Sequence, residues 1–120
     1  MTTNQDIIIE QVFGDQAENA KKIAQCESRM NPEIIGDTHI MGMLDGEMIG
    51  DSIGLFQIRT GDAGVYDSKP WNRAKANGMS VAEFRVKLQD AEYNVKYAKD
   101  IYDRQGWSAW FNCMNKTGVK

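Results

Sequence analysis

The sequence is poor in the residues and patterns that mark several large classes of protein. It contains one histidine, two cysteines and two prolines, and no purely apolar run exceeds the three residues at 7–9. Because a membrane-spanning helix needs about 20 mostly apolar residues, we expect no membrane insertion. No charged start with an apolar stretch and a cleavage site precedes this run, so we expect no export signal in this chain.

An excess of basic charge is also missing. Lys and Arg number 14 against 17 Asp and Glu, which gives a net charge of −3, and the basic residues are scattered along the chain. Proteins that bind nucleic acid usually gather basic residues into a stripe or patch, so nucleic acid is not an expected partner. The single His39 and two distant cysteines lack the spacing of metal ligands. We therefore expect no metal ion and no cofactor.

The length and composition suit one small globular unit. The chain has 120 residues, of which 42% are hydrophobic and 26% charged, values that are ordinary for a globular domain. No internal repeat, low-complexity tract or linker divides it. The sequence therefore predicts a single domain over residues 1–120, acting as a monomer.

The two cysteines, Cys26 and Cys113, lie near opposite ends of the chain. If they form a disulfide, the closed loop takes in most of the domain, and the chain-entropy model gives a stabilisation of roughly 4 to 5 kcal/mol. A disulfide would indicate an oxidising location. Two buried free thiols are the alternative, because unpaired cysteines are common inside cytosolic folds.

The first part of the chain has the pattern of two helices. Residues 6–13 can form a short helix, with Asp6 as N-cap and Gly14 as the residue that ends it. A second helix is expected to begin directly after it. Asp15 as N-cap and Glu18 three positions later have the arrangement of a capping box.

The last part of the chain is also predicted to be helical. Pro70 suits the first turn of a short helix that Gly78 ends, and Ser80 with Glu83 forms a second capping box. A long amphipathic helix is expected to follow up to Gly106, before a last short helical segment at 107–113. Its apolar stripe consists of Leu88, Ala91, Val95, Ala98 and Tyr102.

The middle of the chain, residues 33–59, loses the helical period. Glycines punctuate it, with isoleucines between them, which is typical of a small β-hairpin or three-stranded ribbon. Asp45-Gly46 is a favourable turn dipeptide between two apolar pieces. An irregular loop is the alternative that the glycines leave open. The fold class predicted from these elements is α+β, mainly α, with a small β ribbon beside a helical core.

One acidic residue falls on the apolar face of the second helix. Ala20, Ile23 and Ala24 recur at helical spacing, and the same series continues to Glu27 before Pro32 disfavours further helix. A carboxyl on that face loses solvation, which raises its pKa and keeps it protonated near neutral pH. This is the state that acid catalysis needs. On spacing alone, a solvated Glu at a frayed helix end is an equally good interpretation.

Two sequence blocks resemble a known family. The run Glu-Ser-Arg-Met-Asn-Pro at 27–32 resembles the Glu-Ser-x-x-Asn-Pro motif of soluble lytic transglycosylases and goose-type lysozymes, and Ser-Ile-Gly-Leu-Phe-Gln at 52–57 resembles their Ser-x-Gly-Leu-x-Gln motif. Looser similarities occur around Asn94 and at 106–112. The resemblance implies a lysozyme-like fold, with Glu27 as the catalytic acid. Lysozyme is itself the worked example of a Glu whose pKa is tuned in this way, so this reasoning is adopted from that enzyme.

Four further residues are expected to bind substrate. Ser52 and Gln57 belong to the second block, which lines the catalytic cleft in the resembled family, and the Gln57 amide can both donate and accept a hydrogen bond. Gly54, between them, would let backbone approach a substrate closely. Tyr97 offers a phenol to the site, and Trp110 offers a ring that can stack on a sugar.

A second catalytic carboxylate is harder to assign. Glycosidases normally use two, and Asp51, next to the second block, is the one to test first, while Asp37, Asp45 and Asp62 resemble ordinary turn residues. In lytic transglycosylases, as the resemblance implies, the N-acetyl group of the substrate replaces the second carboxylate. Hydrolysis and anhydro-product formation both remain open.

The sequence thus predicts an enzyme that cleaves the β-1,4 bond between N-acetylmuramic acid and N-acetylglucosamine in peptidoglycan. Such an enzyme would act outside the cell, in the periplasm or at the cell wall, either as an excised domain or by delivery from a phage. Two alternatives compete with it. One is a glycan-binding module that kept the fold without catalysis, and the other is a helical regulatory protein in which Glu27 is a capping or surface residue.

Overall fold

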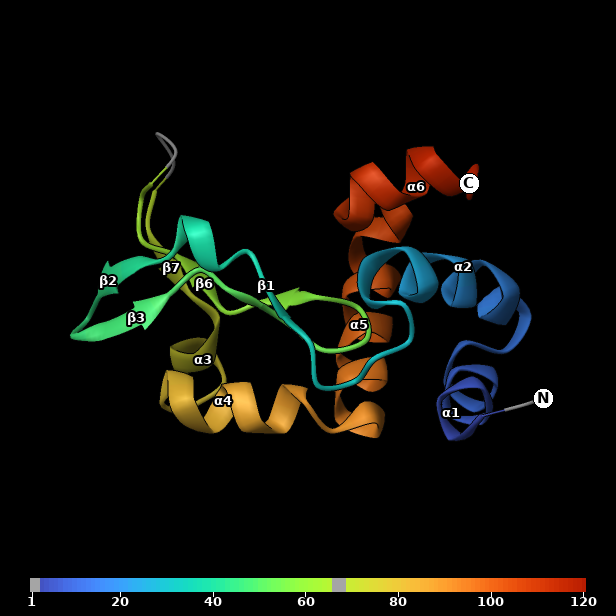
Figure 1. The fold of residues 1–120 in the computed structure, drawn as a ribbon, viewed down its shortest axis with the longest axis horizontal. Helices are drawn as coiled ribbons and strands as arrows, with labels where there is room; N and C mark the ends of the chain where they lie inside the picture. Colours follow the sequence, from blue (N-terminus) through green and yellow to red (C-terminus); the bar gives the residue numbers. More distant parts are fainter. Residues whose placement is uncertain (1–2, 66–68) are drawn as a thin grey trace.

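In the computed structural model, which describes residues 3–65 and 69–120, two helices lie at one end of the molecule (Figure 1). They are α1 (Asn4–Phe13) and α2 (Ala17–Ser28). The expected N-caps were wrong for both helices. Thr3 caps α1, with Asp6 as the acceptor in a capping box, and a short 3-10 turn (Gly14–Gln16) leads into α2 in place of a cap at Asp15.

Helix α2 ends close to the position that Pro32 predicts. Its last residue is Ser28, and Arg29 follows in the left-handed conformation with φ 55°. The face of α2 that was predicted to be apolar is buried: Ala20, Ile23 and Ala24 are fully inaccessible to solvent. This face packs on α1 and on the core, which leaves the end of α2 directed toward the β segments (Figure 1).

The β region consists of three small antiparallel sheets, and the predicted stretch 33–59 contributes both a three-stranded sheet and a hairpin. The strands are β1 (Ile35–Gly36), β2 (Gly42–Leu44), β3 (Glu47–Ile49), β4 (Ser52–Ile53), β5 (Ile58–Arg59), β6 (Gly61–Asp62) and β7 (Trp71–Asn72). They pair as β1-β4-β5, β2-β3 and β6-β7. The predicted turn at Asp45-Gly46 joins β2 to β3, and both residues have positive φ, 54° and 80°, as a two-residue hairpin requires.

The helical second half contains one break that the apolar stripe did not reveal. Helix α4 (Val81–Leu88) begins at the predicted Ser80 cap, but it ends before a new helix, α5 (Ala91–Gln105). The side chain of Asp90 caps α5 by accepting a hydrogen bond from the backbone N–H of Tyr93. The prediction of one continuous apolar stripe from Leu88 onward was therefore wrong, because Leu88 belongs to a different helix.

The short helix α3 (Arg73–Ala76) also begins later than predicted. Its cap is the side chain of Asn72, which accepts from the backbone N–H of Lys75, so Pro70 lies before the helix and before β7. The chain ends with a 3-10 segment (Gly106–Trp110) and α6 (Phe111–Thr117). The mainly α, α+β prediction is confirmed.

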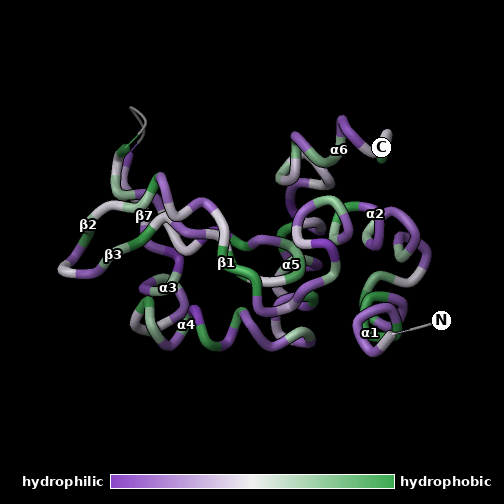
Figure 2. Tube along the Cα trace, viewed as in Figure 1, coloured by the Kyte–Doolittle hydropathy of each residue, from purple (hydrophilic) through white to green (hydrophobic). Residues whose placement is uncertain are grey.

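The core lies around α5, which stands between the β segments and the α1, α2 and α6 helices (Figure 1). Hydrophobic and hydrophilic positions alternate along the outer helices, as expected of helices with one buried face (Figure 2). An aromatic cluster fills the centre, where Phe13 stacks with Phe56 and Trp107 at ring-centroid distances of 5.5 Å. The β and helical parts thus share one apolar core.

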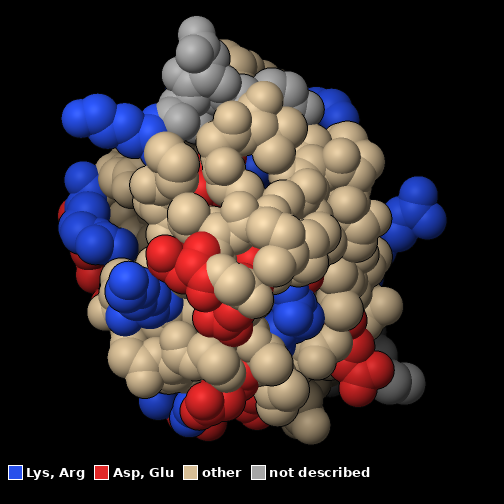
Figure 3. All heavy atoms as spheres, turned by 90° about the vertical axis from the view of Figure 1, so that its left-hand side faces the viewer, with Lys and Arg blue, Asp and Glu red and all other residues tan. Residues whose placement is uncertain are grey.

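Charged side chains are interspersed on the end of the molecule that carries β2 and β3. On the face seen in Figure 3, most lysines and arginines lie toward the edges, and one basic group lies near the centre beside acidic side chains. Within residues 3–65 and 69–120, no helix combines the length and the apolar character that crossing a bilayer would require.

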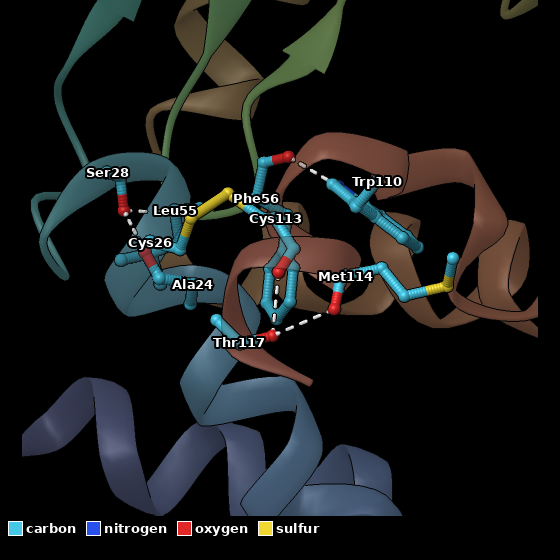
Figure 4. Close-up of a disulfide and its surroundings, with 9 residues drawn as sticks. All are labelled: Ala24, Cys26, Ser28, Leu55, Phe56, Trp110, Cys113, Met114 and Thr117. Atoms are coloured by element: carbon cyan, nitrogen blue, oxygen red, sulfur yellow. Dashed lines mark hydrogen bonds between the residues drawn. A yellow bond between two sulfur atoms is a disulfide. The ribbon is translucent and has the colours of Figure 1, made fainter. Parts of the chain in front are cut away.

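A disulfide joins Cys26 of α2 to Cys113 of α6, as Figure 4 shows. The two Cα atoms are 5.8 Å apart, and the residues are 87 positions apart in the sequence. The disulfide prediction is confirmed, and the alternative of two free thiols is wrong. The bridge fixes the last turn of α2, which carries Glu27, against the C-terminal helix.

Candidate active site

A cleft of about 450 Å³ separates the end of α2 from the β segments. Its polar and aromatic lining comes from three parts of the chain. These are Glu27 of α2; Asp37, Ser52, Gln57, Arg59, Trp71 and Arg73 of the β side; and Gln105, Trp110 and Asn112 of the C-terminal part. In the described part of the chain, no group of three His, Cys, Asp or Glu side chains is arranged to hold a metal ion.

Glu27 lies in the last turn of α2 with its side chain half-buried in the cleft. Burial, with a smaller contribution from the negative charge of Asp37, raises the pKa of its carboxyl from 4.5 to about 7, and Lys116 opposes the shift. Among the described residues, none donates a hydrogen bond to this carboxyl or forms an ion pair with it. Because its burial is uncompensated, Glu27 can carry a proton at neutral pH and donate it.

The serine after Glu27 holds the helix end against the second sequence block. The buried Ser28 Oγ donates to the carbonyl oxygen of Ala24 at 3.0 Å and to that of Leu55 at 2.8 Å (Figure 4). The turn at 54–57 is held from its other side by Asn94, whose Oδ1 accepts from the Phe56 N–H at 3.0 Å and whose Nδ2 donates to the Ile53 carbonyl at 2.8 Å. The two sequence blocks and Asn94 thus meet at one turn.

Gly54 has a different role from the one expected. Its φ is 79°, and a Cβ at this position would collide with the side chain of Asn94 and the carbonyl of Leu88. The close approach that needs glycine is therefore between parts of the protein itself. Gly54 itself is not among the residues that line the cleft.

Gln57 and Ser52 both lie in the cleft, as the sequence predicted. The Gln57 backbone is left-handed, with φ 48°, and its Nε2 donates to the carbonyl oxygens of Gly54 at 3.1 Å and Ile34 at 3.3 Å. With that nitrogen engaged, Oε1 is the atom left to accept a hydrogen bond from a ligand. A Cβ at Gly36 would collide with this oxygen, so the glycine leaves room for it.

A second carboxylate, Asp37, lies in the cleft at a position that the sequence suggested was an ordinary turn. The Ser52 Oγ donates to Asp37 Oδ2 at 2.6 Å, and Asp37 itself adopts a left-handed backbone with φ 57°. The contact follows from strand register, because Gly36 pairs with Ser52 across β1 and β4. The pairing of β1 with β4 places Asp37 beside Ser52. The sequence around Asp37 alone indicated only a turn.

Asp51 does not lie in the cleft. Its carboxylate is 1% exposed and accepts from Arg85, Nε to Oδ2 at 2.6 Å and Nη2 to Oδ1 at 3.0 Å. The Thr60 hydroxyl also donates to Oδ1 at 2.8 Å. These contacts compensate the burial of the charge and join α4 to the β segments. The position of Asp51 fits a structural ion pair, not a group that meets a substrate.

The aromatic candidates divide between the cleft and its surroundings. Trp110 lines the cleft but is only 6% exposed, and its Nε1 donates to the Phe56 carbonyl at 2.8 Å. Tyr97 does not line the cleft, and its hydroxyl accepts from Asn77 Nδ2 at 3.0 Å. Trp71, which was not selected from the sequence, lines the cleft with 37% of its surface exposed. It is the tryptophan best placed to stack on a ligand.

Comparison with known families places most of the chain in one of them. The model of a family described as "Lysozyme like domain" matches residues 11–112. That range contains Glu27, Asp37 and every other residue of the cleft. Neither the comparison with curated proteins nor that with solved structures finds a match.

Proposed function

The chain belongs to the lysozyme-like domain family, and from that premise we propose that it cleaves peptidoglycan. The bond cut is the β-1,4 linkage between N-acetylmuramic acid and N-acetylglucosamine, and Glu27 is the general acid. The observation that carries the proposal is a half-buried carboxyl in a cleft, with its pKa raised to about 7. Protonation of a glycosidic oxygen requires an acid in that state.

In the proposed reaction, Glu27 gives its proton to the leaving oxygen as the bond from that oxygen to the sugar C1 breaks. Positive charge develops on the sugar ring, and the carboxylate of Asp37 stabilises it. Water then attacks C1, its oxygen forms the new bond, and its proton passes to Asp37. The products together contain one more water than the substrate. Exchange with solvent returns the proton to Glu27 and leaves Asp37 ionised.

Asp37 is a better second carboxylate than Asp51. It lines the same cleft as Glu27, close enough to raise the pKa of Glu27, and Ser52 orients it through one hydrogen bond. Asp51 is already occupied by Arg85 and Thr60. The alternative reaction uses the N-acetyl group of the substrate and gives an anhydro-sugar, and it needs no Asp37.

The location of the substrate suits the disulfide. Peptidoglycan lies outside the cytoplasm, where the bond between Cys26 and Cys113 is stable. We expect the chain to act there, in the periplasm or at the cell wall, as a monomer. The core shared by the N-terminal and C-terminal helices supports a single domain over residues 1–120.

Zymography on purified cell walls tests the proposal. The wild-type protein should clear the walls, and Glu27→Gln should lower the rate by about 1000-fold, because the amide keeps the shape but has no proton to give. Glu18→Gln is the matched control, since Glu18 lies on the same helix with its side chain exposed. Wild-type protein that binds the walls without clearing them would contradict the proposal and favour a non-catalytic glycan-binding module.

The mass of the released fragments tests the role of Asp37. Hydrolysis gives products with a free reducing end, whereas transglycosylation gives an anhydro product that is lighter by one water. We expect the hydrolysis mass, and a strong loss of rate in Asp37→Asn. An anhydro product with full activity in Asp37→Asn would mean that the substrate supplies the second group.

A further inference from the structure

Two arginines line the β side of the cleft, away from Glu27 in the sequence. Arg59 ends β5, and Arg73 begins α3 directly after β7. The Arg73 Nη1 donates to the carbonyl oxygen of Arg59 at 2.9 Å, so the two residues are in contact. This places two guanidinium groups in a cleft whose other charged groups, Glu27 and Asp37, are carboxyls.

Arg73 is held by aromatic rings and not by an acidic partner. Its guanidinium lies over the ring of Trp71, 4.9 Å from the centroid, and over that of Tyr97 at 5.8 Å. Across residues 3–65 and 69–120, no carboxylate lies within ion-pair distance of Arg73. Ring stacking fixes the plane of a guanidinium while its N–H groups stay available.

The electrostatics agree with this geometry. Burial lowers the pKa of the Arg73 guanidinium; Tyr97 opposes the shift, and the charges of Arg104 and Arg59 add to it. Among the residues that the structure describes, no carboxylate contributes to this shift. A partly buried cation beside a second cation is costly, and an anion in the cleft would relieve that cost.

Arg59 also keeps part of its hydrogen-bonding capacity. Its Nε donates to the Gly50 carbonyl at 3.2 Å, and its Nη1 is 3.8 Å from Asp62 Oδ2. The buried Nη2 has no hydrogen-bond partner among the described residues. Buried donors are usually satisfied, so Arg59 is not fully committed to contacts within the described part of the protein.

The protein is acidic overall, so an acidic ligand can bind only where basic side chains are close together. The net charge is −3, and on the face seen in Figure 3 the basic side chains are dispersed and interspersed with acidic ones. An acidic polymer therefore meets no broad basic surface there. Among the described residues that line the cleft, Arg59 and Arg73 are the cations that can hold a carboxylate.

From these contacts we infer that Arg59 and Arg73 form a carboxylate-binding subsite, which selects glycans with an acidic substituent on the muramic acid over neutral chitin-like chains. The inference rests on the proposed function for the identity of the glycan. Trp71 stacks under Arg73 and also exposes part of its ring to the cleft, and Tyr97 positions Arg73 from outside the cleft. The subsite thus gives Tyr97 an indirect role.

Binding measurements in the Glu27→Gln background test the subsite without turnover. Three ligands differ in their acidic groups: chitotetraose has none, a peptide-free tetrasaccharide of alternating N-acetylglucosamine and N-acetylmuramic acid carries lactyl carboxylates, and its peptide-bearing form carries carboxylates on the stem peptide. Titration calorimetry should give tighter binding for the acidic ligands. Arg73→Gln should weaken binding of acidic ligands by about tenfold, the loss of one charge-assisted contact, and change chitotetraose binding by less than about twofold.

Two further variants separate binding from support of the fold. Arg73→Lys keeps the charge but loses the planar fork, so it should recover part of the acidic preference. Arg104→Gln removes one charge from the outside of the cleft, near Arg73, and should leave the preference unchanged. Chitotetraose binding reports whether each variant has kept a working cleft.

The outcomes are distinct. A loss confined to the peptide-bearing ligand supports the subsite and assigns the stem peptide as its occupant. A loss confined to the peptide-free ligand assigns the lactyl carboxylate, and a loss with both acidic ligands shows that the subsite accepts either carboxylate. Equal loss for acidic and neutral glycans, or no loss, would overturn the subsite. Failure to clear cell walls with an intact acidic preference would remove the proposed activity and keep the subsite.

Discussion

The two sides of the cleft keep their shape by different means. On the α2 side, an apolar face, the aromatic cluster and the disulfide between Cys26 and Cys113 hold the chain. On the β side the strands are two or three residues long, and polar contacts connect them, above all Asp51 with Arg85 and Thr60. Each side therefore depends on a different kind of interaction.

The same contrast separates two buried carboxyl groups. Asp51 accepts hydrogen bonds from Arg85 and Thr60, so its charge is compensated and it serves the fold. Glu27 has no such partner among the described residues, so burial raises its pKa to about 7. Burial alone therefore does not mark a functional carboxyl. What marks it is burial without compensation in a cleft.

Breaking the disulfide should have the largest effect on the α2 side. The bridge closes a loop between residues 87 positions apart, and its removal should lower the free energy of unfolding by about 4 kcal/mol and the melting temperature by roughly 10 to 20 °C. Thermal melts with and without reductant measure this change. The double variant Cys26→Ser, Cys113→Ser should have the melting temperature of the reduced wild type, with or without reductant. Equal melting temperatures of oxidised and reduced wild type would refute the expectation.

Removing the charge of Asp51 should have the corresponding effect on the β side. Asp51→Asn leaves the guanidinium of Arg85 unpaired, and since that side chain is 25% exposed, we expect a loss of about 2 to 3 kcal/mol. Denaturant unfolding measures it. Asp45→Asn is the control, because the pair of Asp45 with Lys75 is exposed and long at 3.7 Å, so it should cost less than about 0.5 kcal/mol. Equal losses of stability in the two variants would show that the buried ion pair of Asp51 stabilises the β side no more than an exposed pair does.

Glu27→Gln should stabilise the protein, opposite in sign to Asp51→Asn. Between pH 4.5 and about 7 the folded state keeps a proton on Glu27 that the unfolded state has released, so stability falls as pH rises through this window. At pH 8 the variant should be more stable by about 1 to 2 kcal/mol, a figure lowered for solvent screening of a half-exposed group. At pH 4 wild type and variant should unfold alike. A variant that is less stable at pH 8 would show that the Glu27 charge is compensated.

The smallest expected effects concern the pH profile of kcat/KM. Activity should fall on the alkaline side near pH 7, as Glu27 loses its proton. Asp37→Asn removes a repelling charge, so the remaining activity should fall at lower pH, whereas Lys116→Gln removes an attracting charge and should move the limb to higher pH. Shifts in the same direction would show that these charges do not act on Glu27.

Local patterns predicted the elements whose signals are contained in a few adjacent residues. The end of α2 before Pro32, the Asp45-Gly46 turn and the Ser80 cap are of this kind. The break between α4 and α5 was missed because apolar residues continue at helical spacing on both sides of it. Asp90 ends the run there because its side chain caps a new helix. Such a hydrogen bond from side chain to backbone favours a break over a continuous helix.

The candidate site was predictable to the extent that its residues lie in motifs. Glu27, Ser52 and Gln57 belong to the two blocks, and they share the cleft with Trp110. Asp37 and Arg73 were missed because their positions depend on which strands pair and on how α3 follows β7. Such pairings join residues distant in the sequence, and no spacing within a single segment reveals them.

The three tryptophans differ in environment, and this gives the molecule two optical reporters. Trp107 and Trp110 are 4% and 6% exposed within the aromatic cluster, whereas Trp71 is 37% exposed in the cleft. An indole in water emits at longer wavelength than a buried one, and small quenchers reach it first. The red edge of the fluorescence spectrum therefore follows occupancy of the cleft, while the blue edge follows integrity of the core.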